Sequence, residues 1–281
     1  MLEFWVSDLQ HGEEYFTVPG VSGTWTFTRR SNYHDLVGQT ERGQVVATFY
    51  VSNPDFSLET DDQQSIDLSD DLVDICLVLS FLNAHCVTVT GTTLGSRGML
   101  MQLDERHLAA RSIVGFDRLW NPDFSGLFAD WQTVIRPAYR QRGLRLQLSH
   151  WLSGLTCFTL EDLYLSAGVQ MDMVKQQEIA AGGGPGLTYF QGMQSASTRY
   201  GIIPLSHDAT KMRNDLLHEG KLSGANFQSK TKRECAQVIA DTMTWLDTYV
   251  LKILGFEDKL HGLPRWKVGA LEHGLPSISI R

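Results

Sequence analysis

Apolar residues recur at helical spacing along two long segments in the second half of the chain. In LEDLYLSAGVQMDMVKQQEI, residues 160–179, they occupy positions i, i+3, i+4, i+7, i+11 and i+14. In SKTKRECAQVIADTMTWLDTYVLKILGF, residues 229–256, a second stripe runs from Ile239 to Ile253, and Gly255 follows as a natural helix end. Such stripes are typical of helices that bury one face against other helices. The second half is therefore predicted to be a helical bundle.

Shorter patterns predict the other helices of this bundle. They cover residues 124–143 with an interruption near Pro137, 145–155, 188–201 and 207–218. The stretch AAGGGPG, residues 180–186, is expected to be a flexible loop, because glycine and proline interrupt regular structure.

The first half carries strand patterns instead. GTWTFTRR, residues 23–30, and GQVVATFYVS, residues 43–52, are rich in β-branched and aromatic residues and begin with glycine. Residues 86–95 and 98–108 are predicted to be two further strands. The polar segment between the first two strands, residues 30–43, is predicted to be a turn.

One helix is predicted within this strand-rich half. DLSDDLVDICLVLSFLNAH, residues 67–85, has apolar residues at helical spacing and helix-capping candidates at Ser69–Asp71. The fold class is therefore α+β, with a small β-rich domain ahead of an all-α bundle. We assign residues 1–120 to the first domain, 121–260 to the bundle and 261–281 to an irregular tail.

Composition restricts the partners of the chain. Its formal net charge is −8 over 281 residues, so any contact with nucleic acid has to be local, because phosphate affinity rests on Lys and Arg. No apolar run approaches the roughly 20 residues that span a bilayer, and the first residues, MLEFWVSDLQHGEEYF, do not resemble a signal peptide. We therefore expect a cytoplasmic protein without a membrane partner.

The cysteines and the basic clusters give weak signals. Four scattered cysteines form no CxxC pair, so neither a zinc site nor a disulfide framework is expected. Two groups of basic residues are given the usual interpretation of a solvated surface, namely Arg136, Arg140, Arg142 and Arg145, and Lys230, Lys232 and Arg233.

The segment KMRNDLLHEG, residues 211–220, combines groups suited to catalysis within one predicted helix. At 100° per residue, Asn214 and His218 share a face with Lys211, whereas Arg213 lies about 140° from His218, toward the apolar side. A buried arginine is costly unless it is paired, so Arg213 is expected to reach the surface or an interface. A second copy of the helix, related by two-fold symmetry, would bring the arginine and histidine together.

These side chains suit the metal-free cleavage of RNA. Histidine moves protons near neutral pH, and arginine binds phosphate and stabilises charge in a transition state. Asn214 is placed to orient the imidazole or a phosphate oxygen. A ribose 2′-OH that attacks its own 3′-phosphate needs such groups, and DNA lacks this nucleophile. We predict that Arg213, Asn214 and His218 are catalytic and that Lys211 binds RNA.

The string RNDLLHEG, Arg213–Gly220, resembles the R-x(4–6)-H motif of HEPN-superfamily ribonucleases, with four intervening residues. The helices before it and the long closing helix that ends in LKILGF resemble the HEPN domains of ApeA-like antiphage proteins. The resemblance covers roughly residues 155–256. The region ahead of it resembles the sensor-like regions that precede such domains, although no motif matches there.

The resemblance implies a metal-independent endoribonuclease that dimerises so that both motifs face one cleft, with a higher oligomer as an alternative. It implies RNA as the substrate, no cofactor, and a role as an antiphage or abortive-infection effector. His218 would be the acid and base, Arg213 the phosphate ligand and Asn214 the polar residue typical of the motif. The N-terminal domain would respond to a phage-derived or protein trigger.

A non-catalytic explanation stays open beside this one. His218 would then only stabilise the helix C-terminus through the helix dipole, and Gly220 would only end the helix. The bundle would be a HEPN dimerisation module, or a module that binds a nucleotide or a partner, without cutting RNA.

Overall fold

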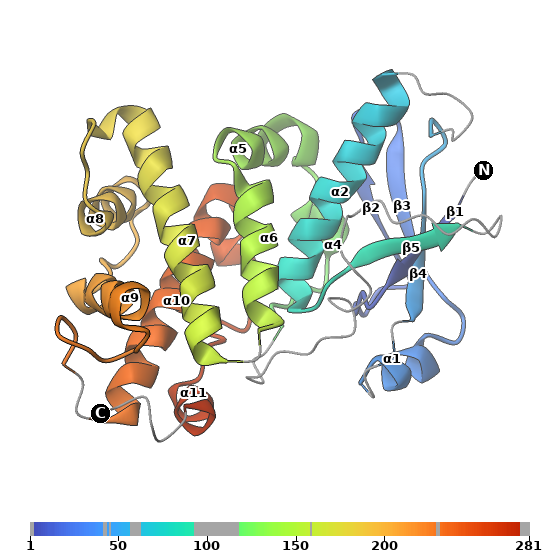
Figure 1. The fold of residues 1–281 in the computed structure, drawn as a ribbon. Helices are drawn as coiled ribbons and strands as arrows, with labels where there is room; N and C mark the ends of the chain where they lie inside the picture. The colour runs from blue at the N-terminus through green and yellow to red at the C-terminus, as the bar shows by residue number, and fades with distance from the viewer. Residues whose placement is uncertain are drawn as a thin grey trace. The chain divides into compact units, whose positions relative to one another are not determined.

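The computed structural model describes residues 3–41, 44, 46–56, 63–92, 118–157, 159–228 and 231–275. These residues form two compact units. The first unit contains the described residues up to Thr92, together with Arg118–Gln141 and Lys259–His261. The second contains those of Arg142–Asp258 and those from Gly262 onward. A sheet followed by helices confirms the predicted α+β class (Figure 1).

The first unit is built on a five-stranded antiparallel sheet with the strand order β2-β3-β4-β1-β5. The strands are β1 Glu3–Ser7, β2 Tyr15–Pro19, β3 Thr24–Arg29, β4 Ala47–Ser52 and β5 Thr88–Thr92. The strands predicted over residues 23–30, 43–52 and 86–95 are thereby confirmed. The strand predicted over residues 98–108 lies outside the described residues.

One face of this sheet is buried, because apolar and polar residues alternate along the strands. Phe16 pairs with Phe27, and Phe27 pairs in turn with Val51, and all of them are buried. The helix α2, Gln63–Asn83, runs beside the sheet (Figure 1). It confirms the helix predicted over residues 67–85, although it begins before the capping candidates Ser69–Asp71.

The turn predicted over residues 30–43 is wrong, because the structure forms the helix α1, Tyr33–Glu41, there. Tyr33 and Leu36 are buried one helical turn apart, which gives this polar segment an apolar anchor. The Tyr33 hydroxyl also accepts a hydrogen bond from the backbone N–H of His11 at 2.9 Å. Tertiary contacts therefore select a helix that the local composition does not predict.

The segment predicted as one interrupted helix, residues 124–143, forms α4 Phe124–Leu127, a π-helical turn Trp131–Ile135 and α5 Arg136–Gln141. Pro137 is the second residue of α5, where proline is tolerated, so the break lies before it. All three pieces belong to the first unit, whereas the sequence-based boundary at 120/121 assigned them to the bundle.

Buried carboxylates of α2 hold this segment in the first unit. Asp71 is fully buried and accepts hydrogen bonds from Nε1 of Trp25 at 3.0 Å and Nε1 of Trp131 at 2.8 Å. It also accepts a hydrogen bond from Gln132 at 2.7 Å and lies 3.2 Å from Nε of Arg136. The tryptophans belong to β3 and to the π-helical turn, so Asp71 ties both to α2.

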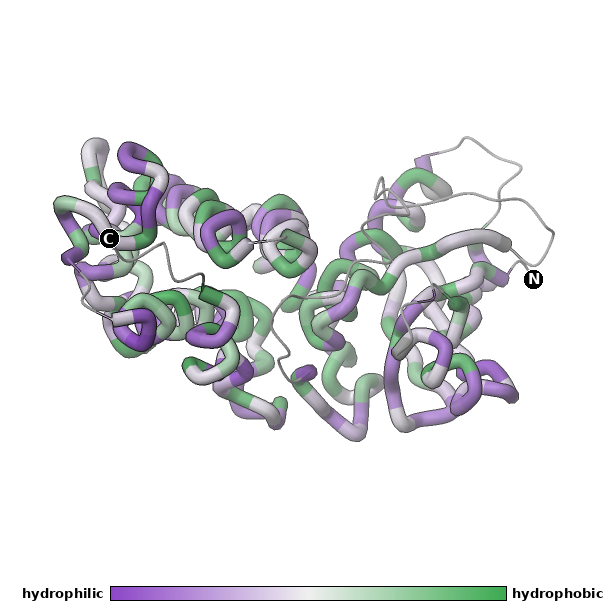
Figure 2. Tube along the Cα trace, turned by 60° about the horizontal axis from the view of Figure 1, so that its bottom comes forward, coloured by the Kyte–Doolittle hydropathy of each residue, from purple (hydrophilic) through white to green (hydrophobic). Residues whose placement is uncertain are grey.

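The second unit is the helical bundle. Its helices are α6 Leu144–Leu155, α7 Leu160–Glu178, α8 Tyr189–Tyr200, α9 His207–Glu219, α10 Lys232–Leu254 and α11 Val268–Gly274. Each apolar residue of the two predicted stripes is buried, and hydropathy varies along the helices as such stripes require (Figure 2). No helix among the described residues is both long and apolar enough to cross a membrane.

The segment predicted as an irregular tail contains α11. Residues ahead of α11 are anchored by Asp247 of α10, which is fully buried and accepts hydrogen bonds from Arg265 at 2.8 Å and Trp266 at 2.7 Å. Trp151 of α6 donates to the same carboxylate at 2.9 Å. The sequence analysis did not find this anchor, because its members lie far apart along the chain.

We predict that Asp71→Ala lowers the free energy of unfolding of the first unit by about 3 kcal/mol or more, because the donors around Asp71 would stay buried without a partner. Urea unfolding, followed by tryptophan fluorescence, measures the change. Asp70→Ala is the matched control: Asp70 is half-exposed and 3.8 Å from Arg140, so its loss should change the free energy by less than about 1 kcal/mol. Equal effects of the two changes would contradict the anchoring role of Asp71.

Candidate functional site

The helix α9 carries the motif and is well defined at both ends. Ser206 caps its N-terminus by accepting a hydrogen bond from the backbone N–H of Asp208 at 3.2 Å. Gly220 ends it with a φ of +67°, a left-handed conformation that favours glycine. Met212 and Leu216 bury the apolar face of the helix. The motif therefore lies on a fixed helix, at the position that the sequence predicts.

Arg213 is half-buried on the side of α9 that faces α7 and α8. Its guanidinium carbon lies 3.7 Å from the centroid of the Tyr189 ring, and Nη2 donates a hydrogen bond to the Tyr189 hydroxyl at 2.6 Å. Its aliphatic stem packs on Gly168 of α7, where a Cβ would lie 3.3 Å from Cγ of Arg213. A small residue at position 168 and an aromatic residue at position 189 thus fix the direction of this arginine.

The positive charge of Arg213 has no carboxylate partner among the described residues. Its Nη1 donates to Oδ1 of Asn214 at 3.2 Å, and its Nε is buried without an acceptor. The arginines at positions 136, 142, 199 and 265 differ, because each forms an ion pair with a carboxylate that is fully buried. Arg213 is therefore suited to binding an anion from outside the chain.

His218 lies in the last turn of α9 and is exposed. No hydrogen bond or ion pair joins its side chain to another residue in the described part of the chain. Leu217, beside it, keeps 50% of its surface exposed. The structure thus joins Arg213 and Asn214 by a hydrogen bond, whereas the exposed His218 shares no hydrogen bond with either of them.

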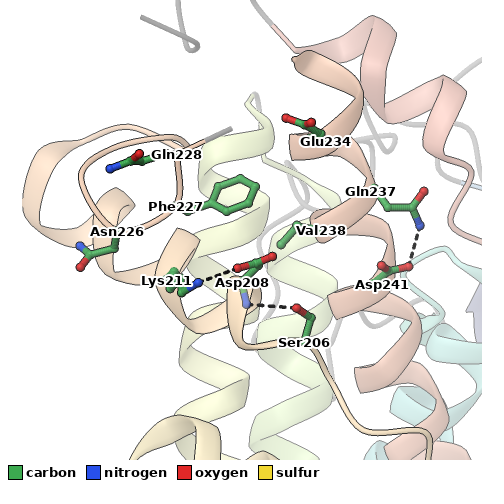
Figure 3. Close-up of a pocket in the computed structure, with 10 residues that line it drawn as sticks. All are labelled: Ser206, Asp208, Lys211, Asn226, Phe227, Gln228, Glu234, Gln237, Val238 and Asp241. Atoms are coloured by element: carbon green, nitrogen blue, oxygen red, sulfur yellow. Dashed lines mark hydrogen bonds and ion pairs between the residues drawn. The ribbon is translucent and has the colours of Figure 1, made fainter. Parts of the chain in front are cut away.

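Lys211 faces a different environment, an open pocket of about 640 Å³ between the start of α9, the segment 226–228 and α10 (Figure 3). Its Nζ lies 3.0 Å from Oδ1 of Asp208. Glu234 and Asp241 of α10 line the same pocket, so its carboxylates outnumber its single ammonium group. This charge balance opposes the binding of phosphate. We therefore do not retain Lys211 in the RNA-binding set that we propose below.

Asp215 is a structural residue of the motif that the sequence analysis missed. It is fully buried, and it accepts hydrogen bonds from the backbone N–H groups of Gly224, Asn226 and Phe227 at 3.0, 3.0 and 2.6 Å. The Asn226 side chain donates to it as well, at 2.6 Å. Asp215 thus holds the irregular segment after α9 against the helix. The available signal was an aspartate five residues before the helix-ending glycine, ahead of the polar segment of residues 221–228.

The hydrogen bonds also set the charge of Asp215. Burial alone would raise the pKa of this carboxyl, but the hydrogen bonds from Phe227, Asn226 and Gly224 outweigh burial and lower the pKa below its ordinary value. Asp215 is therefore ionised at neutral pH, and it serves the segment after α9 instead of the Arg213 guanidinium.

Neither a group of possible metal ligands nor the arginines at positions 136, 140 and 142 extend this site within the described residues. No group of three or more His, Cys, Asp or Glu residues that could hold a metal ion occurs among the residues described. Of the first basic cluster, Arg136 and Arg140 bind Asp74 of α2, and Arg142 binds Glu178 of α7. These arginines stabilise the fold and do not extend the site.

Comparisons of the chain with protein-family models, with curated proteins and with solved structures give no match. The HEPN resemblance therefore rests on the motif of α9 and on the helices around it.

We predict that Asp215→Asn speeds hydrogen exchange at the amides of Gly224, Asn226 and Phe227, because an amide group replaces an acceptor-only carboxylate. In the wild-type protein, acid should lower the protection factors of the same amides, which compare the measured exchange rate with the intrinsic rate at each pH. Since the folded pKa is lowered, the stabilisation is complete above the unfolded pKa of about 4 and is lost as the pH falls through the folded value.

Glu219→Gln is the control for this prediction. Glu219 is exposed and accepts one hydrogen bond, from the backbone N–H of Ala225 at 3.1 Å, so its replacement should leave exchange at the other amides nearly unchanged. Unchanged exchange in Asp215→Asn would show that the carboxylate does not hold this segment.

Proposed function

We propose that the helical bundle is a metal-independent endoribonuclease of the HEPN type, in which Arg213, Asn214 and His218 act on RNA. The observation that carries the proposal is the half-buried guanidinium of Arg213. It is oriented by Tyr189 and Asn214, and no carboxylate among the described residues neutralises it. A group with this charge and this fixed direction suits a phosphate oxygen.

The reaction follows from these groups and from the substrate itself. The ribose 2′-oxygen forms a bond to the adjacent phosphorus, and the bond from phosphorus to the 5′-oxygen of the next nucleotide breaks. His218 takes the proton from the 2′-OH as a base and then, as the acid, gives it to the departing 5′-oxygen. Arg213 stabilises the charge on the non-bridging phosphate oxygens. The products are a 2′,3′-cyclic phosphate and a 5′-hydroxyl end.

A second copy of the chain is the proposed way to complete the site. Arg213 is directed toward α7 and α8, whereas His218 is exposed at the end of α9. Leu217 is 50% exposed, and Val169, the neighbour of Gly168 in α7, is 41% exposed. Exposed apolar residues of this kind suit a two-fold interface in which each α9 meets its copy. Arg213 of one copy would then meet His218 of the other.

The biological role proposed with this activity is that of an antiphage effector, and it rests on the HEPN resemblance. The first unit would be the regulatory part that receives the trigger. The second candidate function, a non-catalytic binding module, is favoured by one observation: within one chain no hydrogen bond joins Arg213 to His218. The two functions differ in whether RNA is cut.

We predict that the purified protein cuts RNA, but not single-stranded DNA, in the presence of EDTA, and leaves 2′,3′-cyclic phosphate ends. His218→Ala should lower the rate by roughly 10²–10⁴-fold, because the proton-transfer group is lost. Arg213→Lys should lower it as well, since a lysine keeps the charge but loses the planar fork. Gel analysis of end-labelled RNA measures the products.

His207→Ala is the matched control, because His207 is an exposed histidine at the other end of α9. The His207→Ala variant should cleave RNA at the wild-type rate. Thermal melting should show that all variants are folded. Cleavage that EDTA abolishes, or normal cleavage by both site variants, would contradict the mechanism. No cleavage of any RNA would favour the binding module.

A further inference from the structure

A second cation lies beside Arg213, at the point where α7, α8 and α9 meet. Tyr189 is the first residue of α8, and its ring lies within reach of Arg213 of α9 and Lys175 of α7. Nζ of Lys175 lies 4.6 Å from the ring centroid, and the guanidinium carbon of Arg213 lies 3.7 Å from it. Two positive charges from different helices thus share one aromatic ring.

The backbone holds this arrangement in place. A capping box between Thr188 and Gln191 fixes the first turn of α8, so the position of Tyr189 is set by the helix start. Gly192 lets α8 approach α7 closely, because a Cβ at this position would lie 2.9 Å from Cβ of Lys175. Gly168 does the same for Arg213. The two cations are therefore brought together by the packing of three helices.

The charges around the ring do not balance. Lys175 has one carboxylate neighbour, Asp172, at 3.5 Å, and Arg213 has none among the described residues. Nζ of Lys175 lies 4.6 Å and the guanidinium carbon of Arg213 lies 3.7 Å from the same ring centroid, so no more than about 8 Å separates the two like charges. They repel each other, and an anion that binds both would relieve the repulsion. Of the five N–H groups of Arg213, one donates to Asn214 and one to Tyr189, so further donors are left for such an anion.

We infer that Lys175, Tyr189 and Arg213 form one binding site for a phosphate group of the RNA chain, in which Lys175 and Arg213 bind the phosphate and Tyr189 positions the guanidinium. This inference rests on the proposed function for the identity of the ligand. Arginine supplies a planar fork and lysine a point charge, which together match the oxygens of a phosphodiester. Since Arg213 lies over the ring of Tyr189, the role of Tyr189 is to orient this arginine, not to stack a base.

The test measures binding to RNA that cannot be cut. A fluorescein-labelled 2′-O-methyl oligoribonucleotide lacks the nucleophilic 2′-OH, and anisotropy titrations of the full chain at several KCl concentrations give its affinity and salt dependence. Lys175→Gln should weaken binding and should reduce the slope of log K against log salt by about 0.7, the value for one phosphate contact on a single strand. Tyr189→Phe should weaken binding with an unchanged slope, because both cations remain.

Lys211→Gln is the matched control for this test. Like Lys175, Lys211 is a partly buried lysine of the bundle that pairs with an aspartate on its own helix, but it lies in the pocket of Figure 3, which Glu234 and Asp241 also line. Its replacement should change neither the affinity nor the slope. A loss of affinity for the oligonucleotide in Lys211→Gln as large as that in Lys175→Gln would show a general charge effect and would overturn the assignment.

Inorganic phosphate and a nucleoside monophosphate serve as competitors. If the monophosphate binds more tightly than the oligonucleotide, the ligand is a free nucleotide, and the assignment to the RNA chain is overturned.

Failure of this inference and failure of the proposed function give different results. If Lys175→Gln shows the expected loss of slope but natural RNA is not cut, the phosphate site stands and the ribonuclease proposal fails. If natural RNA is cut and Lys175→Gln binds and cuts normally, the ribonuclease proposal stands and the phosphate site is overturned. No binding of the oligonucleotide by the wild-type protein would also overturn the site.

Discussion

The pairing of fully buried carboxylates with donors from distant segments is the interaction on which this fold depends. Among the described residues these carboxylates belong to Asp71, Asp74, Glu178, Asp215 and Asp247. Each of them gathers hydrogen bonds or ion pairs that join separate elements, because an unpaired charge in the interior would be strongly destabilising. Asp71 joins β3 and the π-helical turn to α2, and Asp247 joins α6 and the segment before α11 to α10.

Arg213 is the exception to this pairing, and the exception is informative. The fold neutralises the arginines at positions 136, 142, 199 and 265 with buried carboxylates, yet it directs Arg213 onto a tyrosine ring and an asparagine. The motif string contains two carboxylates, and both are used by the segment after α9. Asp215 accepts hydrogen bonds from Gly224, Asn226 and Phe227, and Glu219 accepts one from Ala225. A positive charge that the chain leaves without an internal counter-charge is expected where an external anion binds. The ribonuclease proposal gives that anion an identity.

The sequence predicted the elements whose signals are local. The apolar stripes of α7 and α10 indicated both helices and their buried residues, and the glycines at positions 220 and 255 marked helix ends. It did not predict α1, which a buried tyrosine and leucine stabilise through contacts with other segments. The surroundings of Arg213 were missed for the same reason. Tyr189 and Lys175 lie 24 and 38 residues before it and reach it only through helix packing. The spacing of 100° per residue along α9 predicted that Arg213 lies on the side that packs against other helices, but it could not predict which side chains contact it there.

Complementation between two inactive variants tests directly whether two copies of the chain share one site. Arg213→Ala and His218→Ala proteins are mixed under conditions in which subunits exchange, and RNA cleavage is followed in EDTA. If Arg213 of one copy works with His218 of the other, half of the dimers in a random mixture carry one intact site, and about a quarter of the wild-type activity should return. If the mixture stays inactive although mass spectrometry shows mixed dimers, the site is not shared between two copies and the account is contradicted.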